Sequence, residues 1–240
     1  HLVDQGRFRE AELISILTDH KYPVRNVAQN VADLKAQIAA NAKGVQELRK
    51  MIAHFGLETV EAYMAHVQDN AAESVRRVLD RLPELSACDY PTDTSQIIKV
   101  KITIDRQKRE ATVDFTGTSP VMKNNFNAPE PVTRAAVLYV FRVMVENNIP
   151  MNAGCLRPIT IIVPEGSMLK PEYPAAVVAG NVETSQHVTN ALFQALGAMG
   201  NKAFLERLYD DDSNGQVANA AQAYDCAIML SLATATVDAG

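Results

Sequence analysis

The sequence predicts an α+β protein in which a long antiparallel helical hairpin is followed by a mixed α/β layer domain that contains a β-hairpin. Apolar residues recur at spacings of four and three through much of the first 82 residues. Between residues 98 and 116 they alternate instead with polar residues, and helical and strand patterns then follow one another. We therefore divide the chain into a helical region, residues 1–85, and a mixed α/β domain, residues 86–240.

The helical region begins with a short amphipathic segment from Phe8 to Leu17, which ends at a loop around Tyr22-Pro23. A seven-residue apolar repeat then predicts a helix about 45 Å long, with the pattern of a coiled-coil seam. The members of this repeat are Val27, Val31, Leu34, Ile38, Asn41, Val45, Leu48, Ile52 and Phe55. Gly56 is suited to end this helix, and Thr59 to cap a second one.

The second helix carries a matching apolar stripe, made of Val60, Met64, Val67, Ala71, Val75, Val78 and Leu82. Because a link of only four residues joins the two helices, we expect them to form an antiparallel hairpin, a shape that suits an interaction arm. Asn41 is the one polar residue of the first stripe. It is either a device that selects a register or a partner, or a partly exposed position, which is the commoner situation.

The helical periodicity ends between Leu82 and Gln96, where proline, aspartate and threonine residues predict a domain boundary. Two strands then follow, separated by the polar turn of residues 106–109. Their inward residues are Ile98, Val100, Ile102 and Ile104 in the first, and Ala111, Val113 and Phe115 in the second. This period-two pattern predicts a β-hairpin. Beyond it we expect a helix over residues 131–145, a strand over 159–163, and helices over 183–199 and 218–232.

The composition excludes several classes of partner. The formal net charge is −5 and the pI about 5.6, with no basic face, which argues against nucleic acid. No stretch approaches the roughly 18 apolar residues of a membrane span, and no signal peptide is visible at the N-terminus, so we expect a cytoplasmic location. The three cysteines, Cys88, Cys155 and Cys226, form no C-x-x-C pair. We expect reduced thiols, with a nucleophilic role for Cys155 as the weaker alternative.

The most informative stretch runs from Ala179 to Asn190, where a strand is expected to end and a helix to begin. The first N–H groups of a helix lack intrahelical partners and can face an anionic ligand. Glu183 lies in the expected first turn and His187 one turn later, on the same face. The pair can supply a general base or share a metal ion, with His187 as a weak metal candidate. The alternative is a structural network that caps the helix.

A second polar cluster follows the β-hairpin. The stretch from Asp114 to Ser119 leads into a loop that contains Asn124, Asn125 and Asn127. Asparagine side chains both donate and accept hydrogen bonds, so three of them can hold one ligand; the plainer explanation is that they satisfy turn geometry. The sequence contains no Ser/His/Asp signature, P-loop or G-x-G-x-x-G motif, so it offers no recognisable loop for binding ATP.

Several motifs together resemble the hydantoinase B/oxoprolinase family. They are Gly180-Asn181-Val182-Glu183-Thr184-Ser185-Gln186, the run from Asp114 to Ser119 with the Asn-rich loop through Pro129, and the segment Pro150 to Ile159, which is similar to the family's N-x-G-x-x-R-P segment. The opening Val3-Asp4-Gln5-Gly6-Arg7-Phe8 and the long helices are also similar. The resemblance covers roughly residues 1–200.

The resemblance implies an ATP-dependent system that opens 5-oxoproline or hydantoin rings, or a related carboxylase. ATP is expected to bind an A-type partner subunit or domain, which phosphorylates the amide or carbonyl oxygen, and the B-type part then acts on the activated species. By this resemblance Glu183 and Asn181 are the catalytic candidates. The candidates for substrate contact are Thr184, Ser185, Gln186, Asn124, Asn125 and Arg157.

Two departures from the family pattern qualify this expectation. Family members are much longer, and a His/Asp-rich segment associated with a metal normally precedes the position of His1. We therefore expect an internal fragment, inactive by itself, with any divalent metal in the missing N-terminal region. Beyond Gly200 a Gly- and Asn-rich block is expected, but Lys202 to Leu208 and an Ala-rich segment stand there instead. The alternative function is a non-catalytic scaffold that docks partner subunits through the helical hairpin.

Overall fold

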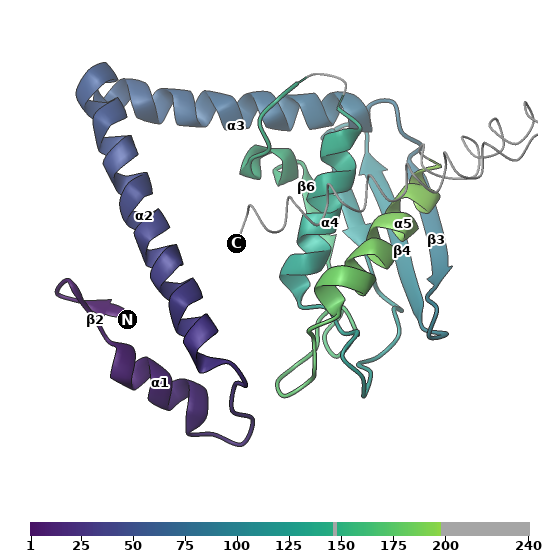
Figure 1. Ribbon diagram of the computed structural model, residues 1–240. Coiled ribbons are helices and arrows are strands. Elements are labelled where there is room, and N and C mark those ends of the chain that lie inside the picture. Colours follow the sequence, from purple (N-terminus) through teal and green to yellow (C-terminus); the bar gives the residue numbers. More distant parts are fainter. Residues whose placement is uncertain (146–147, 198–240) are drawn as a thin grey trace, which may run out of the picture. The chain divides into compact units, whose positions relative to one another are not determined.

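The computed structural model describes residues 1–145 and 148–197 (Figure 1). They fall into two compact units, one from His1 to Tyr63 and one from Met64 onward. The domain division at residue 85 stays a prediction. The helix expected over residues 218–232 lies outside the described residues.

The first unit contains a small β-hairpin and two helices. Strands β1 (Val3–Asp4) and β2 (Arg7–Phe8) pair antiparallel around Gln5 and Gly6, both of which have positive φ. A two-residue turn with positive φ at both positions has a backbone twist that matches the twist of the two flanking strands. Helix α1 (Glu10–Thr18) follows, and α2 spans Val27–Phe55. The side chain of Asn26 caps α2 by accepting a hydrogen bond from the backbone N–H of Gln29.

Helix α3 (Leu57–Leu79) starts directly after Gly56, which has φ +84°. The expected four-residue link and the capping role of Thr59 are therefore wrong, because Thr59 lies inside the first turn of α3. One glycine is sufficient because it adopts the left-handed backbone that ends one helix and starts the next. The long helix itself is confirmed, with the predicted limits.

The apolar stripe of α2 is covered only near its start. Leu13 of α1 and Val31 of α2 are both buried, and Lys35 forms an ion pair with Glu10 of α1, with 2.9 Å between nitrogen and oxygen. Further along, Val45, Leu48 and Phe55 are 48%, 37% and 58% exposed.

The second unit is built on a four-stranded sheet in the order β3-β4-β5-β6. Its strands are β3 (Leu85–Pro91), β4 (Ile97–Asp105), β5 (Glu110–Asp114) and β6 (Ile159–Ile162). The β4–β5 pair is the predicted hairpin, and its alternating residues are buried as expected. Strand β3 was missed, because its inward residues include Ser86 and Cys88, which hide the period-two apolar pattern.

Helices α4 (Glu130–Val143) and α5 (Ser185–Leu196) lie side by side over the sheet (Figure 1). Helix α4 carries the chain from β5 to the parallel strand β6, as a crossover connection must. Phe115, Phe141 and Leu192 are among the fully buried side chains between these layers. The buried residues of α3 (Ala71, Val75 and Leu79) join the same core. The core thus fixes α5, whose N-terminal end carries the candidate site.

The two described cysteines, Cys88 and Cys155, are free thiols buried in this core. Burial raises the pKa of the Cys88 thiol. Cys155 lies in the short 3₁₀ helix η1 (Ala153–Leu156) and is fully buried, so a substrate cannot reach it without local opening. In the described part of the chain, no helix combines the length and apolar character that crossing a membrane requires.

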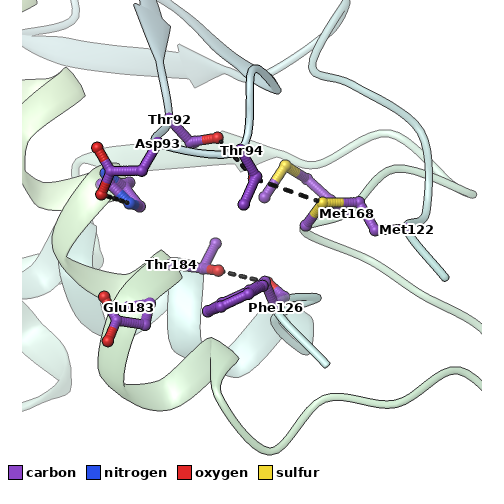
Figure 2. A pocket seen from close by; sticks show the side chains of 9 residues that line it. Thr92, Asp93, Thr94, Met122, Phe126, Met168, Glu183 and Thr184 are labelled. Atoms are coloured by element: carbon purple, nitrogen blue, oxygen red, sulfur yellow. Dashed lines mark hydrogen bonds and ion pairs between the residues drawn. The ribbon is translucent and has the colours of Figure 1, made fainter. Parts of the chain in front are cut away.

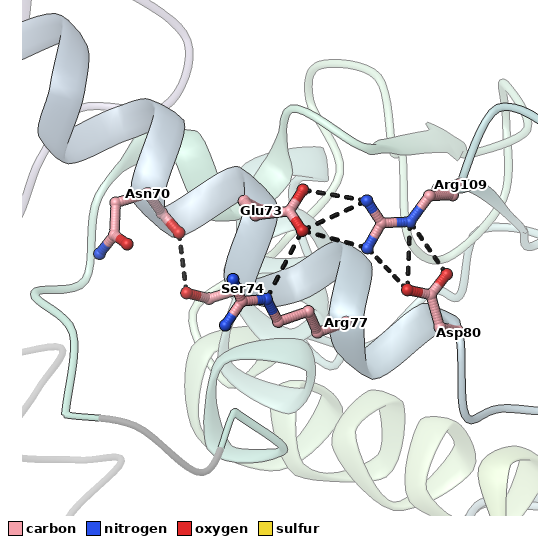
Figure 3. Close-up of polar contacts among 6 residues, drawn as sticks. All are labelled: Asn70, Glu73, Ser74, Arg77, Asp80 and Arg109. Atoms are coloured by element: carbon pink, nitrogen blue, oxygen red, sulfur yellow. Dashed lines mark hydrogen bonds and ion pairs between the residues drawn. The ribbon is translucent and has the colours of Figure 1, made fainter.

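An arginine at the β4–β5 turn ties the sheet to α3 (Figure 3). Arg109, with φ +55°, donates hydrogen bonds to Glu73 and to Asp80, at 3.1 Å and 2.6 Å for the shortest bond to each. Arg77 forms a further ion pair with Glu73. The guanidinium fork thus bridges two carboxylates that lie about two helical turns apart on one side of α3.

This cluster should make stability depend on pH. Hydrogen bonds from Arg109 hold the pKa values of Glu73 and Asp80 below their ordinary 4.5 and 3.8. Carboxyls with a depressed folded pKa stabilise the fold above their unfolded pKa, and this contribution is lost as the pH falls through the folded pKa. We expect Arg109→Met to lower the free energy of urea unfolding at neutral pH and to flatten its decline below about pH 4.5.

The matched control is Arg49→Met, which removes an exposed arginine of α2 that has no carboxylate partner among the described residues. It should leave the shape of the pH profile unchanged. Parallel profiles for the wild type and Arg109→Met would show that the ion-pair cluster does not contribute to folding.

Candidate functional site

A cavity of about 240 Å³ lies at the end of the sheet, next to the start of α5 (Figure 2). Four segments supply its walls: the β3–β4 turn, the Asn-rich loop after β5, the loop after β6, and the segment that leads into α5. The lining residues are Thr92, Asp93, Thr94, Met122, Phe126, Met168, Glu183, Thr184 and His187. The stretch from Ala179 to Asn190 and the Asn-rich loop, which are far apart in sequence, thus meet at this cavity.

The β3–β4 turn is held by its own threonine. The backbone N–H of Thr92 donates to the Gln96 carbonyl, and the Thr92 hydroxyl accepts from the Gln96 N–H. Ser95 adopts a positive φ of 62°, which closes the turn. As a result the side chains of Thr92, Asp93 and Thr94 lie across the cavity from Glu183 and Thr184 (Figure 2).

The Asn-rich loop is organised by Asn127, which is fully buried. Its side-chain oxygen accepts from the Met122 N–H at 2.8 Å. Its amide nitrogen lies within 3.1 Å of the backbone carbonyls of Met122, Asn124 and Ala176. The last contact joins this loop to the segment before Gly180. For Asn127 the turn-geometry explanation is therefore correct, since its amide is fully occupied by the backbone.

The chain enters α5 through a π-helical turn, η2 (Gly180–Thr184), and not through an ordinary helix start. An added Cβ at Gly180 would lie 2.1 Å from the Asn127 carbonyl oxygen, so only glycine fits against the Asn-rich loop. The Thr184 hydroxyl donates to the carbonyl of Phe126 on the same loop. Both contacts press η2 onto the loop, and π-turns of this kind are frequent at functional sites.

The π-turn changes the expected anion site. The N–H groups of Ala179 and Gly180 donate to the carbonyls of Asn125 and Val177, and those of Val182 and Glu183 both donate to Ala179. These groups are therefore occupied by the backbone, and the expectation that a row of them faces an anionic ligand is wrong. Polar recognition in the cavity has to come from side chains.

The ionisable groups of the cavity are Glu183, His187 and Asp93. The His187 side chain is only 17% exposed, and its Nε2 lies 3.8 Å from a carboxylate oxygen of Asp93, whose side chain is 94% exposed. Its Nδ1 is buried without a hydrogen-bond partner among the described residues. The predicted Glu-x-x-x-His pair does share one cavity. Asp93 was not predicted as a site residue, because in the sequence it is one of several aspartate and threonine residues that indicate a turn.

These groups do not form a metal centre by themselves. Among residues 1–145 and 148–197, no three histidine, cysteine or acidic side chains are grouped so that they could hold a metal ion. Asp93 and His187 are 3.8 Å apart and Glu183 lines the same cavity, but these three side chains are not grouped closely enough to serve as the three protein ligands of a catalytic zinc site.

The other site candidates lie outside the cavity wall. Asn181, Asn124 and Asn125 are exposed next to it, and the side-chain oxygen of Asn124 accepts from the Phe126 N–H within its own turn. The Ser185 hydroxyl donates to the Asn181 carbonyl, and Gln186 is half-buried. The structure thus brings Glu183, Thr184 and His187 together and leaves these residues at the margin.

Arg157 lies away from the cavity. It follows η1 and donates hydrogen bonds to Asp69 and Gln68 of α3, at 2.5 Å and 2.8 Å. An added Cβ at Gly154 would meet the backbone of Gln68 at 2.1 Å, so η1 packs closely on α3. In this arrangement Arg157 holds η1 against the helix.

The cavity combines apolar and polar walls. Met122, Phe126 and Met168 offer carbon and sulfur atoms, while the other lining residues offer threonine hydroxyls, two carboxylates and an imidazole. Thr184 is 1% exposed and its proton is engaged with Phe126, so the groups able to move a proton are the ionisable ones, Glu183, His187 and Asp93. Such a site suits a small ligand with an apolar part and hydrogen-bonding groups.

Comparison with known proteins gives consistent matches. A family model described as hydantoinase B/oxoprolinase matches residues 1–222. The chain is 42% identical to 5-oxoprolinase 1 of Arabidopsis thaliana over 220 residues, which is 82% of this chain and 17% of that protein. It is 45% identical to 5-oxoprolinase of Dictyostelium discoideum over 209 residues, 83% of this chain and 16% of that protein. The chain thus spans less than a fifth of the length of these relatives.

Two solved structures share the fold. The ATP-dependent caprolactamase from Pseudomonas jessenii superposes with a TM-score of 0.62 and 23% identity, over 81% of this chain and 34% of that chain. A nucleotide-free acetone carboxylase superposes with a TM-score of 0.52 and 14% identity, over 67% and 24%. At such identities the similarity concerns the fold alone.

The close approach of Gly180 to the Asn-rich loop leads to a stability prediction. Gly180→Ala should reduce the free energy of unfolding by about 1–3 kcal/mol, because the methyl group overlaps a backbone carbonyl that cannot easily move. Gly44→Ala is the matched control: it lies inside α2 with nothing within 4 Å of the new Cβ. It should stabilise the chain by about 0.5–1 kcal/mol. Urea unfolding of both variants checks this, and a Gly180→Ala variant as stable as the wild type would contradict the packing.

Proposed function

The chain belongs to the hydantoinase B/oxoprolinase family, and from that premise we propose that it is part of the B-type component of an ATP-dependent enzyme that opens a cyclic amide, such as 5-oxoproline or hydantoin, or of a related carboxylase. The observation that carries the proposal is the identity of more than 40% to 5-oxoprolinases over more than four fifths of the chain. The cavity beside α5 supports it, since it holds two of the motif's side chains and His187 directly after the motif.

In this proposal ATP is bound elsewhere, by an A-type subunit or domain. That component uses ATP to phosphorylate the amide oxygen, which makes the amide carbon more electrophilic. After water adds to that carbon, the ring C–N bond breaks, the ring nitrogen takes up a proton, and hydrolysis of the resulting acyl phosphate releases phosphate and the open-chain acid. A divalent metal, where one takes part, is also held outside the described cavity. The contribution of this chain is then to receive the activated ring and to guide the attack of water on its carbonyl carbon.

Glu183 is the side chain best placed for that step. Its carboxylate lines the cavity and can accept the proton of the attacking water as the new carbon–oxygen bond forms. Asn181 is assigned, by the family motif, to orient the ligand from the margin of the cavity. The apolar side, formed by Met122, Phe126 and Met168, would receive the ring carbons.

The alternative function is a non-catalytic piece that docks partner subunits through the long helices. The seven-residue apolar repeat of α2, which is typical of helices that pair with a partner, favours a docking role. The two functions are compatible, because the stripe and the cavity belong to different units of the chain.

Substitution of Glu183 tests the catalytic assignment in the intact enzyme. Glu183→Gln keeps the size of the side chain and removes the base, so ATP-dependent opening of 5-oxoproline or hydantoin should fall by at least about 100-fold. Asn181→Ala should also abolish turnover, and both variants should keep the unfolding transition of the wild type.

The matched control is Glu172→Gln, an exposed carboxylate nearby in sequence that does not line the cavity. It should retain full activity. Turnover by Glu183→Gln at the wild-type rate would refute the assignment of the base.

The isolated chain of 240 residues should show no turnover, because the proposal places ATP binding on another component. Isothermal titration with 5-oxoproline, hydantoin, ATP and a divalent metal separates the two functions. If the chain binds a cyclic amide and Glu183→Gln abolishes that binding, the catalytic hypothesis is supported. A chain that binds none of the four ligands supports the scaffold.

A further inference from the structure

The opening of an activated cyclic amide places charge on the ring nitrogen. Phosphorylation of the amide oxygen leaves a C=N bond, so the ring nitrogen then carries a lone pair and no hydrogen. When water adds to the carbon, an electron pair moves onto this nitrogen, which leaves when the C–N bond breaks. A hydrogen-bond donor that faces the nitrogen stabilises this transition state.

Most polar side chains of the cavity have no hydrogen to offer a ligand. The Thr184 hydroxyl donates to the Phe126 carbonyl. The hydroxyls of Thr92 and Thr94 lie 3.1 Å apart, and that of Thr94 also donates to Met122 Sδ, 4.0 Å away (Figure 2). Ionised carboxylates only accept hydrogen bonds. No lysine or arginine of the described chain lines the cavity.

His187 supplies the remaining side-chain donor. Its side chain is 17% exposed, and its Nδ1 is buried with no hydrogen-bond partner among residues 1–145 and 148–197. A proton on Nδ1 would have no acceptor, which is unfavourable for a buried N–H group. A proton on Nε2 faces a carboxylate oxygen of Asp93 instead. The neutral imidazole therefore carries its proton on Nε2.

The Nε2–H group is held in place but is not used by the protein itself. The 3.8 Å between Nε2 and the Asp93 oxygen is longer than a hydrogen bond, so the N–H stays available to a ligand. The Tyr90 ring of β3 lies beside the imidazole, with 5.8 Å between the two ring centroids. The Tyr90 hydroxyl in turn accepts a hydrogen bond from Asn190 of α5, at 3.4 Å.

We propose, on the basis of the function proposed above, that His187 is a catalytic residue, which donates a hydrogen bond from Nε2 to the ring nitrogen of the activated cyclic amide. Glu183, four residues earlier in the same cavity, serves the attacking water. Both residues belong to the second unit of the chain, so their arrangement is fixed within that unit.

The protons of this step balance between the water and the ring nitrogen. Glu183 takes the first proton of the water as the C–O bond forms, and passes it to the nitrogen. It then takes the second proton from the new hydroxyl as the C=O bond forms again, and delivers it to the nitrogen as the C–N bond breaks. His187 keeps its own proton throughout. The products are an acyl phosphate and a free NH₂ group.

Substitution of His187 in the intact enzyme tests the proposal. His187→Leu removes the donor and should lower kcat by at least about 100-fold, with little change in KM. His187→Gln keeps an N–H group at a similar reach and should regain at least about 10-fold of that loss. A histidine that only filled space would not be rescued in this way. The matched control is Gln194→Leu, at an exposed position of α5 outside the cavity lining, which should retain full activity.

Rapid-quench measurement of a single turnover separates this role from an effect on folding. In His187→Leu, ADP should form at the wild-type rate, because phosphorylation belongs to another component, while ring opening should be slow. A wild-type kcat for His187→Leu, or an equal loss in His187→Gln, would overturn the role of His187. If Glu183→Gln then still lacks turnover, the proposed function stands without this step. If Glu183→Gln is also fully active, the assignment of the base fails as well.

Discussion

The candidate site depends on one buried amide. Asn127 is fully buried, and its side chain contacts four backbone groups, of which Ala176 lies on a segment distant in sequence. A buried amide left without these partners would be destabilising, so the loop after β5 and the segment before η2 are held in one arrangement. Gly180 then packs on the Asn127 carbonyl, and Thr184 binds the carbonyl of Phe126. The position of Glu183 follows from these contacts, because it lies between Gly180 and Thr184 on the same π-turn.

Periodicity in the sequence was sufficient to predict the elements with a single apolar face. Helix α2 and strands β4 and β5 each carry apolar residues along one side. Their predicted and observed limits agree within a residue or two. Strand β3 was not predicted, because Ser86 and Cys88 face inward and a pattern of small polar residues resembles a loop. The π-turn could not be predicted either, since it results from contacts with the Asn-rich loop and not from the propensity of residues 180–184.

The same distinction applies to the site. Glu183 and His187 are one helical turn apart, so local spacing alone places them in one cavity. Asp93 joins them through the pairing of β3 with β4, which is a tertiary contact that a single sequence does not reveal. Arg157 shows a different situation: its motif suggests ligand contact, which stays a prediction, while its guanidinium binds Asp69 and Gln68 of α3. A charged residue in a family motif can serve the fold as well as the ligand.

The two long helices obtain their stability in different ways. Helix α3 becomes buried toward its C-terminal half, where Ala71, Val75 and Leu79 enter the core and Arg109 bridges Glu73 and Asp80. Helix α2 has 29 residues, and within its own unit it packs against α1 near Val31, which is buried. Its many alanines favour helix locally, yet most helical stability in proteins comes from tertiary packing of the apolar face. The apolar repeat of α2 therefore adds to stability through whatever surface packs against it, whereas the cavity is fixed by contacts within its own unit.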